Sequence, residues 1–216
     1  MNVRLISHTP EPDFVAGRAA AICVGGNIHD AGACTKALRG ALASGHESIA
    51  EHNAFTFLIE GVSRVLLAQL TRHRMASYSV QSQRYCGADL DMHIPDSMAT
   101  AELVDDIVQL RRNVADLYHK AVAAGVPEED ARYFTLQGGT TKLVLTMNAR
   151  ELRHFFWLRC CNRAQTEIRD LADAMLAECK EVAPILFDNA GCACMAGKPC
   201  PEGKRACGNP RGGEKA

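Results

Sequence analysis

Residues 72–84 read Arg-His-Arg-Met-Ala-Ser-Tyr-Ser-Val-Gln-Ser-Gln-Arg, and this stretch decides how the chain is interpreted. An arginine presents a planar fork of donors that matches a phosphate group, and serine hydroxyls complete such a site. By itself the triplet Arg72-His73-Arg74 would be explained as the end of a helix, where the helix dipole favours cations. The second basic and hydroxyl-bearing cluster, Ser82 and Arg84, instead favours a binding site for a small anionic molecule such as a nucleotide.

The residues on either side of this stretch predict a helix-rich fold with a small sheet. Apolar alternation and β-branched or aromatic residues predict strands at 2–7, 54–59 and 142–147, the second of them ended by Gly61. Apolar residues at helical spacing predict helices at 10–24, 33–43, 62–70 and 103–125, a short one that begins at Pro127, and a long one from Asn148 to about 186 with a break near Cys160-Cys161. Asn148 followed by Glu151 is typical of a helix N-terminus. The fold class is therefore α+β, a single helix-rich domain with a small, mostly antiparallel sheet.

Composition limits the classes of protein to which the chain can belong. Its 216 residues suffice for one domain with a sizeable core, and 47% of them are hydrophobic and 23% charged. The formal net charge of -1 argues against a protein that binds nucleic acid through a basic surface. No apolar run approaches the roughly 18 residues of a membrane span, and no signal-peptide pattern opens the chain. We expect a cytoplasmic protein that binds neither nucleic acid nor membranes.

The C-terminal tail (residues 191–216) differs in composition from residues 1–190, which form the predicted domain. The tail is rich in glycine, proline and lysine and poor in large apolar residues, so it cannot bury a core. Four thiols in the tail could close a tetrahedral zinc site and thereby order it. These thiols belong to Cys192, Cys194, Cys200 and Cys207. Their spacing is not the usual paired Cys-x-x-Cys, and the alternatives are an unligated flexible tail or disulfides.

The stretch at 72–84 resembles the signature of the flavin-dependent thymidylate synthases. That signature is Arg-His-Arg, seven residues, a serine, and an arginine two positions further on, here ending in Ser82 and Arg84. Blocks on both sides of the signature resemble the same family. The upstream block is His46-Glu47-Ser48 with Glu51-His52 and Phe55-Thr56-Phe57. The downstream blocks are Met147-Asn148-Ala149-Arg150 and residues 158–165. Ordered blocks around a long signature make the resemblance specific, and it covers roughly residues 1–190.

The resemblance implies which residues hold the substrate dUMP. Ser82 and Arg84 are the expected phosphate ligands, and a charge-assisted hydrogen bond of this kind contributes about 1.5–3 kcal/mol. Arg132 and Arg159 resemble two further arginines that contact dUMP, although without the family blocks each would be explained as a surface salt bridge. Gln69 is implied to add a polar contact to the same nucleotide.

The resemblance also implies the reaction and its catalytic residue, Arg159. A guanidinium aimed at the uracil oxygen would stabilise negative charge as the fifth carbon of the ring becomes nucleophilic. NADPH would reduce FAD, methylenetetrahydrofolate would supply the one-carbon unit, and dUMP would become dTMP. The chain is thus expected to be an enzyme, an FAD-dependent methyltransferase of nucleotide biosynthesis that acts on small molecules.

The FAD site implied by the resemblance lies between subunits of a homotetramer. The residues implied to contact FAD are Arg72, His73, Arg74, Asn148, Arg150, His154 and Arg163. Asn148 has a competing explanation as a helix N-cap. His52 resembles a histidine on the flavin and folate side of the site, and a buried structural histidine is the alternative.

The chain departs from the family pattern at several positions. Many members have Asn-Glu where this chain has Ser79-Val80, and valine cannot hydrogen-bond a nucleotide, so Gln81 is expected to replace that contact. Others have Leu-Pro at Thr135-Leu136, histidine at Arg163, and often asparagine at His154. A relative that binds flavin and nucleotide without methyl transfer is therefore an alternative function.

Two functions from other classes fit the sequence less well. A metalloprotease could start from His46-Glu47 and His52, but its two histidines should be four residues apart on one helix face, and these are six apart. A nucleic-acid-binding module could use the basic stretch and the cysteine tail. The near-neutral charge and the aromatic content of 6% argue against the stacking platforms of such modules.

Overall fold

The computed structural model describes residues 1–87 and 90–212, so residues 213–216 of the predicted tail lie outside the described residues. Four strands form one sheet in the order β1-β2-β4-β3, and they are β1 (Asn2–His8), β2 (Ala54–Ser63), β3 (Ala76–Val80) and β4 (Thr140–Asn148).

Backbone hydrogen bonds at the strand ends give the direction of each strand. Thr9 N donates to Ala54 O, Arg64 N donates to Gly139 O, and Gln81 N donates to Lys142 O. Each bond joins the end of one strand to the beginning of its neighbour, so neighbouring strands run antiparallel. The predicted α+β fold with a small antiparallel sheet is confirmed.

Helices account for most of the remaining regular structure. The longer ones are α1 (Pro12–Cys23), α2 (Ala31–Ala43), α3 (Arg64–Leu70), α5 (Val104–Ala123), α7 (Ala149–Arg159) and α8 (Thr166–Val182). The short ones are η1 (Glu47–His52), α4 (Asp96–Thr100), α6 (Glu128–Ala131), η2 (Arg132–Phe134) and η3 (Gly203–Arg205). The predicted break near Cys160-Cys161 is confirmed, because α7 ends at Arg159 and α8 begins at Thr166.

One prediction about local structure is wrong, and one strand was not predicted. Gly61 does not end β2, which continues to Ser63 with Val62 buried. Gly61 has a φ of 69°, a conformation that glycine adopts without the strain that a side chain would cause. Residues 76–80 form a strand, β3, that the apolar pattern of the sequence did not predict. Ser77 and Ser79 are exposed and Tyr78 is half-buried, so the alternation exists, but serines in place of β-branched residues conceal it.

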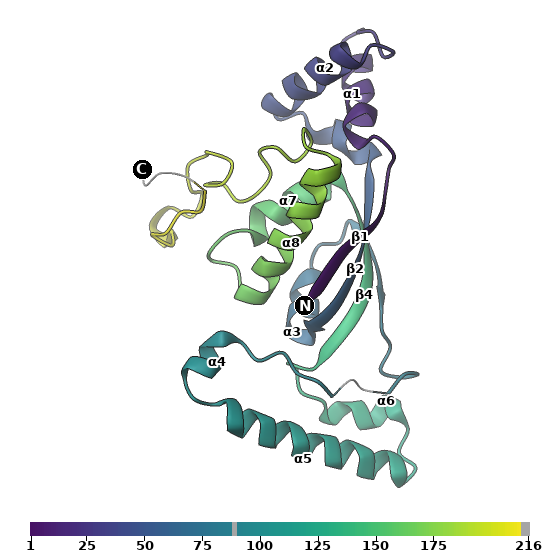
Figure 1. The fold of residues 1–216 in the computed structure, drawn as a ribbon, viewed down its shortest axis with the longest axis vertical. Coiled ribbons are helices and arrows are strands. Elements are labelled where there is room, and N and C mark those ends of the chain that lie inside the picture. The colour runs from purple at the N-terminus through teal and green to yellow at the C-terminus, as the bar shows by residue number, and fades with distance from the viewer. Residues whose placement is uncertain (88–89, 213–216) are drawn as a thin grey trace. The chain divides into compact units, whose positions relative to one another are not determined.

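The chain forms two compact units that share the strands. The first comprises Met1–Asn2, Ile59–Arg72 and Tyr78–Val144; the second comprises Val3–Leu58, His73–Ser77 and the described residues from Leu145 onward. In the second unit α7 and α8 lie beside β1 and β2 (Figure 1), and Leu5 N donates to Glu178 of α8 at 3.1 Å. The core here is aromatic, since the Phe187 ring centroid is 5.4 Å from that of Phe55 and 5.9 Å from that of Phe156.

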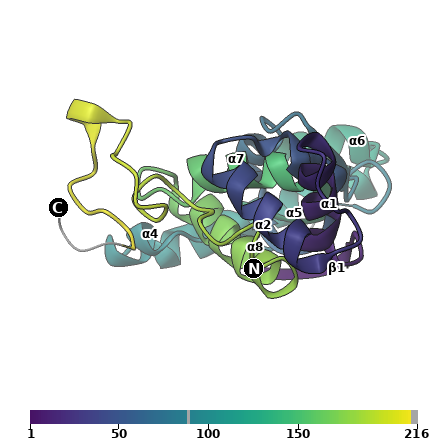
Figure 2. The ribbon, with the colours of Figure 1, turned by 90° about the horizontal axis from the view of Figure 1, so that it is seen from above.

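The remaining helices complete each unit separately. In the second unit α1 and α2 pack side by side, as both views of the ribbon show (Figure 2). In the first unit α5 buries Tyr118 but leaves Leu110 and Leu117 exposed, at 48% and 47% of their full accessibility. Among the described helices none is both long enough and apolar enough to span a bilayer.

Candidate functional site

The signature segment places its side chains in different environments. Arg72 N donates to Gln69 O at 3.3 Å at the end of α3, and the Tyr78 hydroxyl donates to Leu70 O at 2.8 Å. The side chains of Arg72 and Arg74 are exposed, whereas His73 is only 4% exposed. The imidazole of the triplet therefore belongs to the protein interior, and the two flanking guanidinium groups face solvent.

His73 joins two residues of α7 in the second unit. Its Nδ1 lies 3.1 Å from Glu151 Oε1, and its Nε2 accepts a hydrogen bond from Arg159 Nε at 3.2 Å. Because Nε2 accepts, it carries no proton, so Nδ1 carries the proton and donates it to the carboxylate. We call Glu151, His73 and Arg159 the His73 cluster. It holds the predicted catalytic guanidinium through a neutral imidazole whose tautomer is set by a carboxylate.

The local sequence of α7 explains why Glu151 is available to His73. Asn148 Oδ1 accepts a hydrogen bond from Glu151 N at 2.8 Å, which confirms the N-cap explanation of Asn148. In a capping box the glutamate three residues after the cap would reach back to the cap backbone, but here its carboxylate bonds to His73. The helix start therefore contributes a carboxylate to the cluster.

Burial and charge keep His73 neutral. Burial lowers the pKa of His73 from its ordinary value of 6.5, and the Arg159 charge lowers it further, against the hydrogen bond to Glu151, which raises it. The His73 ring also packs edge-on against Phe155, with ring centroids 4.9 Å apart. A neutral imidazole is the form that can accept a hydrogen bond from an arginine.

The other predicted flavin residues of the second unit have protein partners. Arg150 forms an exposed ion pair with Glu51. Arg163 donates to Arg205 O in the tail at 2.6 Å, and the His154 ring centroid is 6.0 Å from that of His73. His52, at the end of η1, is exposed, so the alternative of a buried structural histidine is wrong. Contact of these four residues with FAD or folate stays a prediction.

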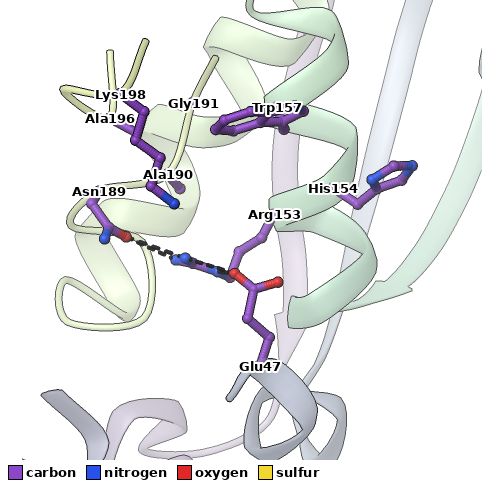
Figure 3. A pocket seen from close by; sticks show the side chains of 9 residues that line it. All are labelled: Glu47, Arg153, His154, Trp157, Asn189, Ala190, Gly191, Ala196 and Lys198. Atoms are coloured by element: carbon purple, nitrogen blue, oxygen red, sulfur yellow. Dashed lines mark hydrogen bonds and ion pairs between the residues drawn. The ribbon is translucent and has the colours of Figure 1, made fainter. Parts of the chain in front are cut away.

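A pocket of about 310 Å³ lies beside α7 in the second unit (Figure 3). Arg153, at 9% side-chain exposure, points toward Glu47 and Asn189 and contacts their oxygens at 2.9 and 3.2 Å, while the His154 ring points away from them. Lys198 Nζ lies 5.5 Å from the centre of the Trp157 ring. The Arg153 network joins η1, α7 and the segment before the tail, so its role is to hold these elements together.

The predicted phosphate ligands lie in the first unit, after β3. Ser82 Oγ accepts a hydrogen bond from Arg84 N at 3.1 Å, and Arg84 Nε donates to Glu129 Oε2 at 2.7 Å. Arg132 Nε donates to the backbone oxygen of Glu129 at 3.0 Å. The Arg84–Glu129 pair is half-exposed, and such a pair contributes roughly 0–1 kcal/mol. A phosphate could therefore replace Glu129 at Arg84 at little cost.

The structure points to two residues to which the sequence assigned no functional role. Glu151 was predicted only as part of a helix start, and no pattern linked it to His73 because the two are 78 positions apart. Arg64 begins α3 and lines a pocket with Arg132. A charged residue inside the apolar run that precedes the signature was the signal available in the sequence. Of the predicted nucleotide contacts, Gln69 Nε2 lies 3.4 Å from Val65 O, and Gln81 N bonds to Lys142 O.

The structure does not gather the four tail cysteines around a metal. Cys192 Sγ and Cys194 Sγ are 3.8 Å apart, whereas Cys200 and Cys207 are exposed. Over residues 1–87 and 90–212, no three His, Cys, Asp or Glu side chains are grouped so that they could hold a metal ion. The predicted zinc site is therefore not supported. The tail is instead held by Arg211, which donates to Asp173 at 2.8 and 2.9 Å and to Cys160 O at 2.7 Å.

Known proteins similar to this chain share its length and its fold. A flavin-dependent thymidylate synthase of Geobacter sulfurreducens is 44% identical over 219 residues, which cover 96% of this chain and 94% of that protein. The flavin-dependent thymidylate synthase of Helicobacter pylori, crystallised with FAD and dUMP, matches with a TM-score of 0.71 and 26% identity over 88% of this chain and all of that chain. A UMP/dUMP methylase of Streptomyces cacaoi, crystallised with 5-Br dUMP, matches the fold with a TM-score of 0.79 at 23% identity over 87% of this chain and 93% of that chain.

A protein-family model also matches most of the chain. The model is described as "Thymidylate synthase complementing protein", and it matches residues 4–185, which include the signature, the His73 cluster and all three arginines predicted to contact the nucleotide, Arg84, Arg132 and Arg159. The chain therefore belongs to the thymidylate synthase complementing protein family.

Proposed function

We propose that this chain is a flavin-dependent thymidylate synthase, which converts dUMP to dTMP by reductive methylation. The observation that carries the proposal is the 44% identity to the Geobacter sulfurreducens enzyme over nearly the whole of both chains. The Helicobacter pylori relative, crystallised with FAD and dUMP, supports FAD as the cofactor and dUMP as the substrate. The Arg-His-Arg signature with Ser82 and Arg84 is complete in this chain.

The surface arginines of the signature fit an anionic cofactor. Within the described residues neither Arg72 nor Arg74 forms an ion pair with a carboxylate, and both are exposed. Each guanidinium can therefore bind a phosphate of FAD without displacing a protein partner. Asn148, His73 and the residues Arg150, His154 and Arg163 complete the proposed FAD contacts. When bound and reduced, FAD supplies the hydride that completes the methyl group.

Arg159 is the proposed catalytic residue, and the His73 cluster supports this role. Its Nε donates to His73, which fixes the plane of the guanidinium, and the rest of the fork carries further donors. Aimed at a uracil oxygen, these donors stabilise the negative charge that develops as the fifth carbon attacks the one-carbon unit. A guanidinium whose orientation is already fixed by its hydrogen bond to His73 does not have to reorient as the charge develops.

The nucleotide is held by residues of the first unit. Ser82 and Arg84 are the proposed phosphate ligands. Arg132 is a further proposed contact to dUMP, and Gln69 and Gln81 are the proposed polar contacts to the same nucleotide. The backbone around them is fixed by the sheet, since Gln81 N bonds to Lys142 O of β4 at 3.0 Å. The weak exposed pair between Arg84 and Glu129 leaves Arg84 able to change partners.

The remaining parts of the proposal concern co-substrates and assembly. NADPH is the proposed reductant and methylenetetrahydrofolate the proposed one-carbon donor, with His52 on the folate side, where its exposure leaves it able to contact a ligand. A homotetramer is supported by α5, whose exposed Leu110 and Leu117 lie seven residues apart on one face that a second copy would cover. We retain residues 1–190 as the catalytic domain, 191–216 as an accessory tail, and a cytoplasmic location.

Release of tritium from the fifth carbon of uracil tests the function. The purified chain is incubated with labelled dUMP, NADPH and methylenetetrahydrofolate, with and without FAD. Release that requires FAD, together with formation of dTMP, supports the proposal, and light scattering on the same sample reports the assembly. Protein that is folded and loaded with FAD but forms no dTMP would instead be the relative without methyl transfer. Restoring Asn-Glu at Ser79-Val80 would then be the first variant to assay.

A further inference from the structure

A pocket of about 320 Å³ lies in the second unit between the end of α7 and the tail, and several thiols line it. Its cysteines are Cys161, Cys192, Cys194 and Cys200, and its arginines are Arg159 and Arg163. We call it the thiol pocket. The proposed reaction gives no role to any of these cysteines, so what they do is a separate question.

Two of these cysteines already lie side by side. Cys192 Sγ and Cys194 Sγ are 3.8 Å apart, and a single residue separates them in the chain. A disulfide has an S–S distance of about 2.05 Å, so the two sulfurs would have to approach by about 1.8 Å. Rotation of side chains between staggered positions supplies movements of this size. We call Cys192 and Cys194 the thiol pair, and its geometry is that of two groups placed to form a bond.

Burial makes the two members of the thiol pair unequal. Cys192 is only 2% exposed, whereas Cys194 is half-buried. A small molecule in solution therefore reaches the sulfur of Cys194, while the sulfur of Cys192 is shielded by the protein. An accessible cysteine beside a second one that can displace its partner is the usual arrangement of redox-sensitive thiols.

The surroundings also favour Cys194 as the attacking thiol. A hydrogen bond from the Arg211 backbone lowers the pKa of Cys194, whereas burial raises the pKa of Cys192. Because the thiolate is the nucleophile in thiol chemistry, the sulfur with the lower pKa is the more reactive one at neutral pH. Arg211 is itself held by its ion pair with Asp173 of α8 at 2.8 Å, so the hydrogen-bond donor is fixed in place.

Two further cysteines lie near the thiol pair. Cys160 is fully buried, and burial raises the pKa of its thiol, so it stays protonated and inaccessible. Cys161 is half-buried, lines the thiol pocket, and is close enough to Cys192 for their charges to interact. Cys161 is therefore the alternative bonding partner of Cys192 that an experiment must distinguish from Cys194.

We propose that Cys192 and Cys194 form a thiol–disulfide exchange site whose substrates are small aliphatic disulfides. The thiolate of Cys194 attacks one sulfur of the small disulfide, whose S–S bond breaks and releases a first thiol. Cys192 then gives up its proton and attacks Cys194 Sγ in the mixed disulfide, which releases the second thiol. The thiol pair loses two electrons and two protons and becomes a disulfide, and the small disulfide takes them up as it is reduced to two thiols.

This exchange site goes beyond the proposed function and does not depend on it, although the two share a wall. The thiol pair lines the same pocket as Arg159 and Arg163. Arg163 also contacts the tail, since it donates to Arg205 O at 2.6 Å and lies 3.5 Å from Glu202. The disulfide would therefore form next to the place where the tail meets a residue that is proposed to contact FAD.

Reaction of the folded full chain with glutathione disulfide, used as the probe, tests the proposal. Cleavage after Lys180 and after Met195 releases a peptide that contains Cys192 and Cys194 and no other cysteine, so its mass reports on the thiol pair alone. In the wild type we expect this peptide to lose two hydrogen atoms without keeping a glutathione adduct. Dithiothreitol should then restore both thiols.

Two variants assign the roles of the two sulfurs. In Cys192→Ser the reaction should stop at a mixed disulfide between glutathione and Cys194. In Cys194→Ser the reaction of the same peptide should be at least about tenfold slower, because the remaining thiol is shielded. Cys23→Ser is the matched control, since Cys23 is an exposed cysteine of the same unit and its loss should not change the thiol pair.

The contrary outcomes are equally specific. A disulfide between Cys192 and Cys161, or glutathione on both members of the thiol pair without a bond between them, overturns the proposal. So does an equal rate of reaction in the wild type and in Cys194→Ser. Formation of dTMP is measured separately, so a chain that forms no dTMP but oxidises the thiol pair contradicts the proposed function alone.

Unfolding by urea shows whether the fold creates the site. Cys192 is buried, so Cys192→Ser can fail to fold; the wild type and Cys194→Ser then still decide the question. In the wild type the disulfide should form faster in the folded protein than in urea, because the fold holds the two sulfurs together and stabilises the Cys194 thiolate. A disulfide that forms only in urea would overturn the proposal.

Discussion

The His73 cluster and the pocket lined by Arg64 and Arg132, which we call the arginine pocket, hold their cations in opposite ways. In the cluster, Arg159 Nε has an acceptor in His73, which in turn bonds to Glu151. In the pocket, Arg64 Nε is buried and has no acceptor among the residues that the structure describes. A cation that the protein already bonds keeps its orientation throughout turnover, whereas a cation without a partner gains most when a ligand arrives. The difference is the one expected between a pre-oriented catalytic group, the role proposed for Arg159, and a binding group that a ligand would neutralise.

The two arrangements also differ in their expected effect on stability. The buried hydrogen bonds of the His73 cluster stabilise the fold by about 1 kcal/mol each, because they satisfy polar groups that burial would otherwise penalise. The unpartnered donor of the arginine pocket costs about 1–3 kcal/mol until a ligand binds. Substitutions in the two places should therefore have opposite signatures in kinetics and in stability.

The largest effect is expected from Arg159. The substitution Arg159→Gln should lower kcat by about 10²–10³-fold with a small change in KM for dUMP, because the guanidinium donors act on the negative charge that develops on the uracil ring in the transition state. Tritium release at saturating dUMP measures this, and Arg64→Gln is the comparison, in which KM should rise and kcat should change little. If Arg159→Gln changed KM alone, Arg159 would be a binding residue and the contrast between the two regions would be lost.

Removal of the Glu151 carboxylate, which accepts the hydrogen bond of His73 Nδ1, should have the next largest effect. In Glu151→Ala the imidazole loses the acceptor of its Nδ1 proton, so its tautomer and the position of Arg159 are no longer fixed, and kcat should fall about tenfold. Glu151→Gln keeps an oxygen acceptor and should recover most of the activity. A loss in Glu151→Gln as large as in Glu151→Ala would show that the charge of Glu151 matters and not its role as an acceptor.

The fold followed from the sequence wherever hydrophobic periodicity was clear. The helices around Leu38 and Met175 and the aromatic strand β2 were predictable because each buries an apolar face. The helix around Leu110 was predictable from its apolar spacing, although Leu110 itself is exposed. Strand β3 was not predicted, because its exposed face carries Ser77 and Ser79 and its pairing with β4 is set by partners more than 60 residues away. Pairing over such distances depends on tertiary packing and not on local propensity.

The site was predictable in its residue types but not in its connections. The signature identified His73, and the flanking blocks identified Arg159, yet the sequence assigned one to the flavin and the other to the nucleotide. Their mutual hydrogen bond depends on how α7 packs, which no spacing in the sequence reveals. Arg64 was overlooked because its significance lies in what it lacks, a partner in the folded protein. The tail cysteines show the converse, since four suitable ligands in sequence did not become a site in space.

The pH dependence should show which form of His73 the cluster requires. The pKa of His73 is lowered in the folded protein, so below its ordinary value of 6.5 the unfolded chain binds the proton more readily. Stability from this group is therefore complete above pH 6.5 and falls as the pH drops through the lowered pKa. Activity should fall in the same range, because protonated Nε2 cannot accept from Arg159.

The matched variant for this test is His73→Gln. Its amide can donate to Glu151 and accept from Arg159, but it does not titrate. Urea unfolding and kcat at pH 7.5 and at pH 5.5 should show a smaller acid loss in His73→Gln than in the wild type. Equal losses in the two proteins would place the acid-sensitive group elsewhere.

The smallest effect is expected from Glu129, which competes with phosphate for Arg84. Glu129→Gln removes the carboxylate from an exposed pair, so the free energy of unfolding should change by roughly 0–1 kcal/mol. Affinity for dUMP should rise no more than about fivefold, because a pair of that strength is all that the phosphate must displace.

Combined with Arg64→Gln, the substitution Glu129→Gln tests whether Arg84 and Arg64 act together on the phosphate. Additive changes in dUMP affinity would mean that Arg84 and Arg64 contact the phosphate independently. A gain in Glu129→Gln that disappears without Arg64 would mean that one phosphate bridges both guanidinium groups, so that the arginine pocket and the signature serve a single anion.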